Sequence, residues 1–199
     1  MGKGEITRQA ILDHSVSLAS TLGLDGLTIG RLAEEMDLSK SGLFAHFRSK
    51  ESLQIQTLEH AAARFADLVI RPALAAPRGE PRIRAAFRLW MDWPKKSGMP
   101  GGCLFVAAAV ELDDQPGAAR EHLVAQQRQW LALLANVVRG AVQEGHFRED
   151  LEPEQFAQDL YGVMLACFLS HRLLEDPDAG RRARAAFENL VVAARIPEA

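Results

Sequence analysis

The stretch DLSKSGLFAHFRSKESL, residues 37–53, concentrates side chains that could bind a polyanion. Lys40, Arg48 and Lys50 lie close together there, and a single acid, Asp37, precedes them. Cations and hydroxyls of this kind bind the phosphates and base edges of nucleic acids rather than carry out covalent chemistry. The whole chain has a formal net charge of −3, so binding to a polyanion would depend on this local cluster.

Residue types that support catalysis or metal binding occur elsewhere without forming a recognisable set. The six histidines lack paired metal-ligand spacing, and Cys103 and Cys167 are far apart in the chain. The glycines of GLDGLTIG follow no predicted strand, so they do not indicate a phosphate loop. We therefore predict no enzymatic activity, no metal and no cofactor. A redox role for Cys103 is a minor alternative, because no second cysteine is near it.

Helical periodicity dominates the chain and strand alternation is nearly absent, which predicts an all-α fold of about nine helices. Glycine and proline positions set most of the expected boundaries. The expected helices are one ending at Gly23, then 28–36, 39–46, one from Ser49 to the turn residues at 72–81, then 81–93, 103–112, 117–144, 153–174 and 178–194.

The helices at 28–36 and 39–46 have the spacing of a helix-turn-helix. Ala33 is expected where the two helices cross, since a larger side chain would push them apart. Asp37 occupies a turn position that needs a left-handed residue, a conformation that Asp tolerates. Thr28 is suited to cap the first of these helices, and Ser39 the second.

One face of the second short helix is expected to meet DNA. Its outward side chains are short, polar or cationic with one flat ring: Ser39, Lys40, Ser41, Gly42, Phe44 and His46. Such a helix fits the major groove, while Thr28 and Lys50 are placed to hold phosphates. Leu38, Leu43 and Phe47 are expected to point inward. The alternative is a solvated charged turn between two core helices.

The stretch TIGRLAEEMDLSKSGLFAHFRSKESL resembles the DNA-binding signature of TetR-type transcriptional regulators. The matching positions are Thr28, Ile29, Leu32, Ala33, Ser39, Lys40, Leu43, His46, Phe47, Lys50 and Glu51. Asp37 replaces the usual turn glycine. Phe44 stands where the family often has Tyr, so the phosphate hydrogen bond of a Tyr hydroxyl is not available there.

The resemblance implies a helix-turn-helix DNA-binding domain at 1–48 and a helical effector-binding and dimerisation domain at 49–199. It also implies a regulator, most often a repressor, that binds a near-palindromic double-stranded DNA operator as a homodimer. A small-molecule effector would release it. The main alternative is a helical small-molecule binding protein without DNA-binding activity, and an all-helical enzyme has no residue set to support it.

The last two predicted helices, 153–174 and 178–194, are apolar on more than one face, so they must be buried on two sides. One of these sides can be a second subunit, which predicts dimerisation through these helices. The alternative is that both sides pack inside one core.

In this family the effector pocket lies among the helices that follow the DNA-binding domain. Aromatic and sulfur-containing residues in those helices are therefore candidates for effector binding. They are Phe87, Trp90, Met91, Trp93, Cys103, Phe105, Trp130, Met164, Phe168 and His171. Such a pocket would suit a hydrophobic or aromatic molecule. Stripes of this kind are also ordinary core, and His171 fits a core residue better than a ligand.

The N-terminal residues MGKGEITRQ have no apolar run behind their charges, so we predict no signal peptide. The longest apolar stretches are interrupted well short of a membrane span. We therefore expect a cytoplasmic protein that does not associate with membranes.

Overall fold

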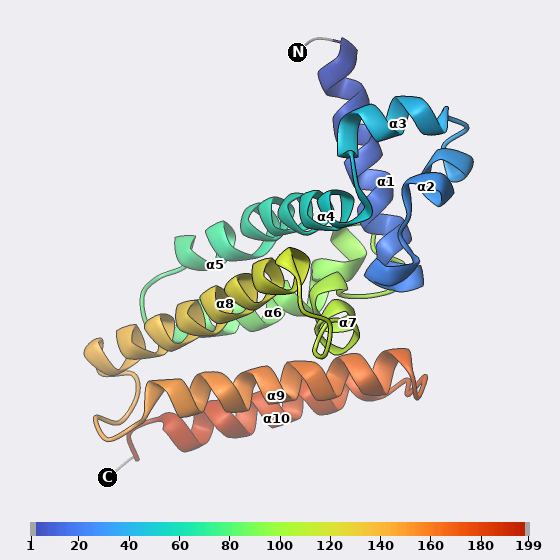
Figure 1. The fold of residues 1–199 in the computed structure, drawn as a ribbon. Coiled ribbons are helices and arrows are strands. Elements are labelled where there is room, and N and C mark those ends of the chain that lie inside the picture. The colour runs from blue at the N-terminus through green and yellow to red at the C-terminus, as the bar shows by residue number, and fades with distance from the viewer. Residues whose placement is uncertain (1–2, 198–199) are drawn as a thin grey trace. The chain divides into compact units, whose positions relative to one another are not determined.

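The computed structural model describes residues 3–197, with side chains from residue 8 onward, and confirms the all-α fold (Figure 1). Apart from an isolated antiparallel bridge between Phe147 and Arg195, the described secondary structure is helical. The elements are α1 (Lys3–Gly26), α2 (Ile29–Glu35), α3 (Lys40–Phe47), α4 (Lys50–Phe65), the π-helix η1 (Ala66–Ile70), α5 (Arg71–Ala75), α6 (Glu80–Lys96), α7 (Leu104–Glu111), α8 (Ala118–Gln143), α9 (Pro153–Arg172) and α10 (Ala179–Ala194). Because α4, η1 and α5 follow without a break, the described chain holds nine separate helical segments.

The chain forms two compact units that interleave along the sequence. Unit 1 contains residues up to Phe65 together with Pro94–Gln126, and unit 2 contains Ala66–Trp93 together with Gln127–Ala199. This packing division differs from the functional division at residue 48 that the sequence suggests, which stays a prediction. It shows that α7 and the first part of α8 fold with the N-terminal helices.

In unit 1, α1 packs against both α4 and α7. Val16 and Ala19 of α1 are fully buried. Gly23 interrupts the helix with φ 78° and ψ 167°, where the sequence predicts its end. The backbone of Gly101 passes so close to α1 that an added Cβ would lie 1.5 Å from the carbonyl oxygen of Ser20. Only glycine fits at position 101.

Hydrogen bonds also fasten the end of α1 to α7 in unit 1. The Glu111 carboxylate accepts hydrogen bonds from the backbone amides of Leu24 at 2.7 Å and Asp25 at 2.5 Å. Gln54 of α4 donates to the Leu24 carbonyl at 2.8 Å. Hydrogen bonds to a charged group contribute about 1.5–3 kcal/mol when they are shielded from water. The segment just before α2 is therefore held by side chains that are distant in sequence.

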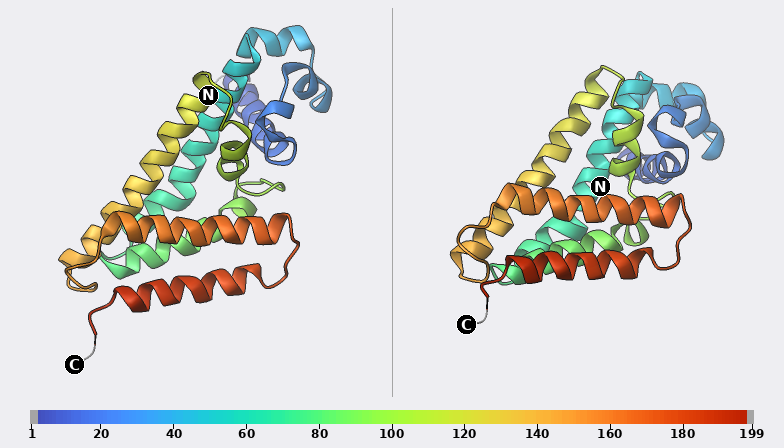
Figure 2. Two further views of the ribbon diagram at one scale, coloured as in Figure 1. Left: turned by 60° about the horizontal axis from the view of Figure 1, so that its bottom comes forward. Right: turned by 90° about the horizontal axis from the view of Figure 1, so that it is seen from below.

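In unit 2, α9 and α10 lie side by side and antiparallel (Figure 2). Met164 and Val191 are fully buried in these two helices. Phe87 of α6 stacks on Phe187 of α10, with ring centroids 4.2 Å apart and planes 13° apart. The sequence predicts that Pro94 ends α6, but the helix continues to Lys96. A proline so near the end of a helix lacks one backbone donor and still permits a final turn.

Candidate nucleic-acid interface

The two short helices of the helix-turn-helix are capped by the residues that the sequence predicts. Thr28 Oγ1 accepts a hydrogen bond from the Arg31 amide at 3.1 Å, and Ser39 Oγ accepts one from the Gly42 amide at 3.1 Å. Such caps satisfy amide groups that a helix start leaves open. Asp37 adopts the expected left-handed conformation, with φ 51°.

The two faces of α3 differ as the binding hypothesis requires. Leu43 and Phe47 are buried, and all the predicted outward residues of α3 and its cap are exposed: Ser39, Lys40, Ser41, Gly42, Phe44 and His46. The prediction that Leu38 points inward is wrong, because this turn residue is 39% exposed. It lies in the turn between α2 and α3, outside the helical periodicity that directs Leu43 and Phe47 inward. We call the exposed residues of Ser39–His46 the reader surface.

Cations beside the reader surface are in two different states. Lys50 Nζ forms an ion pair with Asp25 Oδ1 at 2.5 Å, a contact that sequence spacing could not show. Lys40 and Arg48 form no side-chain hydrogen bond or ion pair with any residue that the structure describes. Arg48 was not among the predicted contact residues. It follows α3 with φ 60°, a conformation that its residue type gives no reason to expect.

Phe44 gives the reader surface one apolar contact, with a ring that is 54% exposed. An exposed aromatic ring among serines and a lysine can touch the methyl group of thymine. The neighbouring His46 is exposed, and its ring centroid lies 6.3 Å from that of the buried Phe47. The major groove admits a single helix of this kind, with an exposed and locally cationic face and with α2 packed against its other side. The fold and this surface define a helix-turn-helix DNA-binding protein.

Comparison with known proteins gives the family. Residues 11–56 match the family described as bacterial regulatory proteins, tetR family. Residues 79–187 match the tetracyclin repressor-like C-terminal domain. The chain belongs to the TetR family of bacterial transcriptional regulators. This is a family of regulators and not of enzymes, which confirms the prediction that the chain is not an enzyme.

Individual proteins agree with this assignment. The transcriptional regulator BetI of Escherichia coli K12 is 26% identical over 167 residues, which are 82% of this chain and 79% of BetI. IcaR of Staphylococcus epidermidis, a negative transcriptional regulator of a biofilm operon, is 27% identical over 64 residues, 32% of this chain and 35% of IcaR. The crystal structure of a TetR regulator from Chloroflexus aurantiacus has the same fold, with a TM-score of 0.86, 22% identity and coverage of 99% of this chain and 100% of that one.

The predicted effector residues are spread over both units. Phe87, Trp90, Trp93, Cys103, Trp130 and Met164 are buried, Met91, Phe105 and Phe168 are half-buried, and His171 is exposed. His171 is therefore not the core residue that the pattern favours, since it lies in the last turn of α9 on its solvent side. Phe87 and Met91 line one cavity of about 580 Å³ between α6 and α10. Phe105 packs edge-on against Phe65 in unit 1, with centroids 6.0 Å apart.

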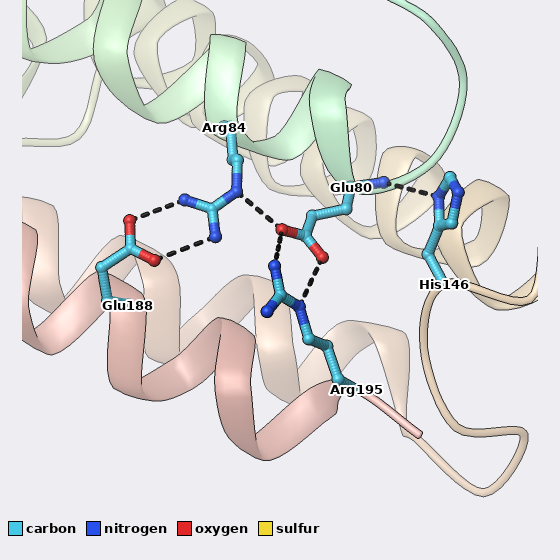
Figure 3. A network of polar contacts seen from close by, with 5 residues as sticks. All are labelled: Glu80, Arg84, His146, Glu188 and Arg195. Atoms are coloured by element: carbon cyan, nitrogen blue, oxygen red, sulfur yellow. Dashed lines mark hydrogen bonds and ion pairs between the residues drawn. The ribbon is translucent and has the colours of Figure 1, made fainter. Parts of the chain in front are cut away.

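Unit 2 also holds a charged network that the sequence did not predict (Figure 3). Arg84 pairs with Glu80 at 2.6 Å and bidentately with Glu188 at 2.6 and 2.9 Å. Arg195 pairs with Glu80 at 2.6 and 2.8 Å, and His146 Nδ1 accepts from the Glu80 amide at 3.2 Å. The hydrogen bond from Arg195, aided by Arg84, lowers the pKa of Glu80 to about 2 although burial opposes the shift.

Other chemical possibilities have less support in the described residues. Burial raises the pKa of the Cys167 thiol, so the reactive thiolate is disfavoured, although nearby Arg184 opposes this. Within residues 3–197, no cluster of His, Cys, Asp or Glu side chains is arranged to hold a metal ion. Among the helices described, none is both long and apolar enough to cross a membrane.

Proposed function

We propose that this protein is a cytoplasmic transcriptional repressor that binds a near-palindromic operator as a homodimer and leaves it when a small-molecule effector binds. The observation that carries the proposal is the reader surface: all of its side chains are exposed while the opposite side of α3 is buried. Lys40 and Arg48 are available to DNA phosphates or base edges. Repression is supported by the match to a repressor-like C-terminal domain and by the similarity to IcaR, a negative regulator.

A homodimer is supported by an exposed stripe of small and apolar residues on each of α9 and α10. The first stripe consists of Gly162, Ala166 and Leu169 of α9 and continues into Leu173 just after it, and the second consists of Ala185 and Val192 of α10, with the polar Asn189 between them and Ile196 just after the helix. Leu173 is 71% exposed and Val192 is 63% exposed. Small residues allow helices to approach closely, and two helices from each subunit would form an isologous four-helix interface.

Two subunits make the modest local charge sufficient for specific binding. Each reader contacts few phosphates, and the electrostatic part of affinity grows with the number of phosphates neutralised. Readers about 34 Å apart would reach successive major grooves on one side of the duplex. An effector can then act by changing the distance between the two reader surfaces. It does so when it binds more tightly to the conformation in which this distance does not match the operator.

The contacts within unit 1 supply a route from α7 to the reader. Glu111 at the end of α7 holds the amides of Leu24 and Asp25, a few residues before α2. Glu51 of α4 accepts a hydrogen bond from the Ala118 amide at the start of α8, at 2.8 Å. A shift of α7 or of the start of α8 would therefore pull on α1 and α4, the helices on which α2 and α3 rest.

The test is selection of fragments of the source genome by the purified protein, followed by sequencing. A near-palindromic sequence enriched at low salt supports the proposal. The absence of any enriched sequence would favour the alternative of a helical binding protein without DNA-binding activity.

The dimer is tested by Ala166→Arg, which places a charge in the exposed stripe of α9. Sedimentation should show a dimer for the unchanged protein and a monomer for the variant, with operator affinity reduced. Gln129→Arg, on the exposed side of α8, is the matched control and should stay dimeric. A monomeric unchanged protein with full operator affinity would contradict this part of the proposal.

A further inference from the structure

The cavity between α6 and α10 has an apolar floor. It lies wholly within unit 2 and has a volume of about 580 Å³, within the range of small-molecule sites. Its apolar lining includes Ala85, Phe87 and Met91 of α6 and Phe187 of α10. The stacked rings of Phe87 and Phe187 fix these two helices against each other. Both rings are almost fully buried and form the base of the cavity, and the half-buried Met91 adds a more accessible apolar side chain.

The rim of this cavity carries three arginines, which differ in how their charge is satisfied. Arg84 is fully engaged, because it pairs with Glu188 and with Glu80. Arg88 and Arg184 also line the cavity and are exposed, yet neither makes a side-chain hydrogen bond or ion pair with another described residue. Asp92 and Glu188 are the carboxylates in the lining, and Glu188 is already occupied by Arg84. The rim thus keeps unused positive charge.

The position of the Arg184 head group brings that charge close to the floor. A Cβ added at Gly180 would lie 3.6 Å from Arg184 Nη1 and 3.9 Å from the terminal methyl of Met91. The guanidinium therefore folds back over Gly180, and the methyl group of Met91 lies near the same glycine. Guanidinium groups bind carboxylates through paired, charge-assisted hydrogen bonds. A molecule with a carboxylate and an apolar body would satisfy the arginines and cover the floor together.

The geometry points to this cavity as the binding site for an amphipathic organic carboxylate. Its carboxylate pairs with Arg88 and Arg184, and its acyl or aromatic body lies over Phe87 and Met91. The inference rests on the proposed function, because it takes this carboxylate to be the effector. It narrows the chemical class of the effector from any hydrophobic molecule to an anionic one. The ion pairs of Arg84 with Glu80 and Glu188 keep Arg84 out of the binding role.

Calorimetric titration of the full chain without DNA tests the site. The probes are decanoate and 4-phenylbutyrate, used below any micelle-forming concentration, with decan-1-ol and 4-phenylbutan-1-ol as uncharged counterparts, used within their solubility in water. Both carboxylates should bind saturably, at least about tenfold more tightly than the alcohols, because a hydrogen bond to a charged group is lost in the alcohols. Affinity for the carboxylates should fall as ionic strength rises.

Three variants assign the binding to this cavity. Arg88→Gln and Arg184→Gln should each weaken carboxylate binding by about tenfold, and the double variant should bind acid and alcohol alike. Both positions are exposed, so the melting temperature should be unchanged. Arg181→Gln is the control, since Arg181 lies on α10, pairs with Asp178 and does not line the cavity. It should bind the carboxylates as the unchanged protein does.

Three results would overturn the inference: no saturable binding of either carboxylate, equal binding of acids and alcohols, or unchanged carboxylate binding in the double variant. Because these titrations contain no DNA, they are independent of operator selection. Operator binding without carboxylate binding removes only this inference, and carboxylate binding without an operator removes only the proposed function.

Discussion

The reader surface on α3 and the charged network of α6 and α10 both concentrate charged residues, but they use them in opposite ways. In the network, Glu80, Arg84, Glu188 and Arg195 satisfy one another across helices that are distant in sequence. On and beside the reader surface, Lys40 and Arg48 have no ion pair with any described residue, and the hydroxyl of Ser39 is used to cap the helix. The charges of the network are therefore neutralised within the protein, whereas those of the reader surface face solvent.

Substitutions in the two regions should therefore affect different properties of the protein. Charges that are matched inside the protein should affect folding and leave binding intact. Charges and polar groups that face solvent from a well-packed helix should affect binding and leave folding intact, because the packing of α3 depends on Leu43 and Phe47. Substitutions in each region therefore test whether the two sets of charged residues differ in this way.

The largest effect is expected from Ser41→Glu on the reader surface. A carboxylate there would face the phosphates and base edges of DNA, and apposed like charges cost several kcal/mol, so operator affinity should fall about a hundredfold or more. The Ser41 side chain is exposed and has only a 3.5 Å contact with Ser39 Oγ, so the melting temperature should not change. DNA titration and thermal denaturation measure the two quantities. Gln129→Glu adds the same charge at an exposed position of α8, outside the reader surface, and should leave affinity nearly unchanged.

Glu80→Gln in the network should lower the stability of the protein and leave operator binding unchanged. The Glu80 pKa falls from 4.5 to about 2 on folding, and its side chain is only 13% exposed. A shift of this size corresponds to roughly 3 kcal/mol, which the half-exposed arginine partners reduce to about 2 kcal/mol. The variant should lose this free energy of unfolding at pH 7, while the operator affinity of the folded protein stays unchanged.

The pH dependence follows from the direction of the Glu80 shift. A carboxyl whose pKa is lowered by folding contributes stability above its unfolded pKa and loses it as the pH falls through the folded value. The difference between the unchanged protein and Glu80→Gln should therefore be full at pH 7 and shrink between pH 4.5 and about 2. Chemical denaturation at several pH values measures it. Asp150→Asn, at an exposed surface pair with Arg148, should change stability by less than about 0.5 kcal/mol.

The smallest effects concern Lys50, which shares features of both regions because it pairs with Asp25 and also borders the reader surface. Lys50→Ala should weaken binding to all DNA sequences and flatten the salt dependence by about one phosphate contact. Asp25→Asn should strengthen binding a few-fold, since it releases Lys50 from an exposed pair worth up to about 1 kcal/mol. DNA titrations over a range of salt concentrations give both. Affinity and salt slope that stay the same in Lys50→Ala would show that Lys50 serves only the ion pair.

Local patterns predicted the helices and the helix-turn-helix well, because their determinants lie within a few residues of one another. The caps Thr28 and Ser39, the left-handed Asp37 and the buried Leu43 and Phe47 all follow from short-range rules. The extension of α6 past Pro94 shows the limit of such rules at a helix end, where losing one donor costs little.

Tertiary pairings could not be predicted in this way. The partner of Lys50 is Asp25, and that of Glu80 is Arg195, and nothing in local spacing connects the members of either pair. The exposure of Leu38 and His171 likewise depends on what packs nearby rather than on the periodicity of their own segments. The α6–α10 cavity could not be predicted from the sequence, because its arginines come from two helices that are almost a hundred residues apart in the chain.

The close approach of Gly101 to Ser20 has a consequence for dividing the protein. A fragment cut off after Phe65 would keep every helix of the DNA reader and still lack the strap that covers α1. The face of α1 that packs on α7 would meet water, and the amides of Leu24 and Asp25 would lose the Glu111 carboxylate. A fragment that keeps these contacts of α1 therefore has to include residues 94–126 as well as residues up to Phe65.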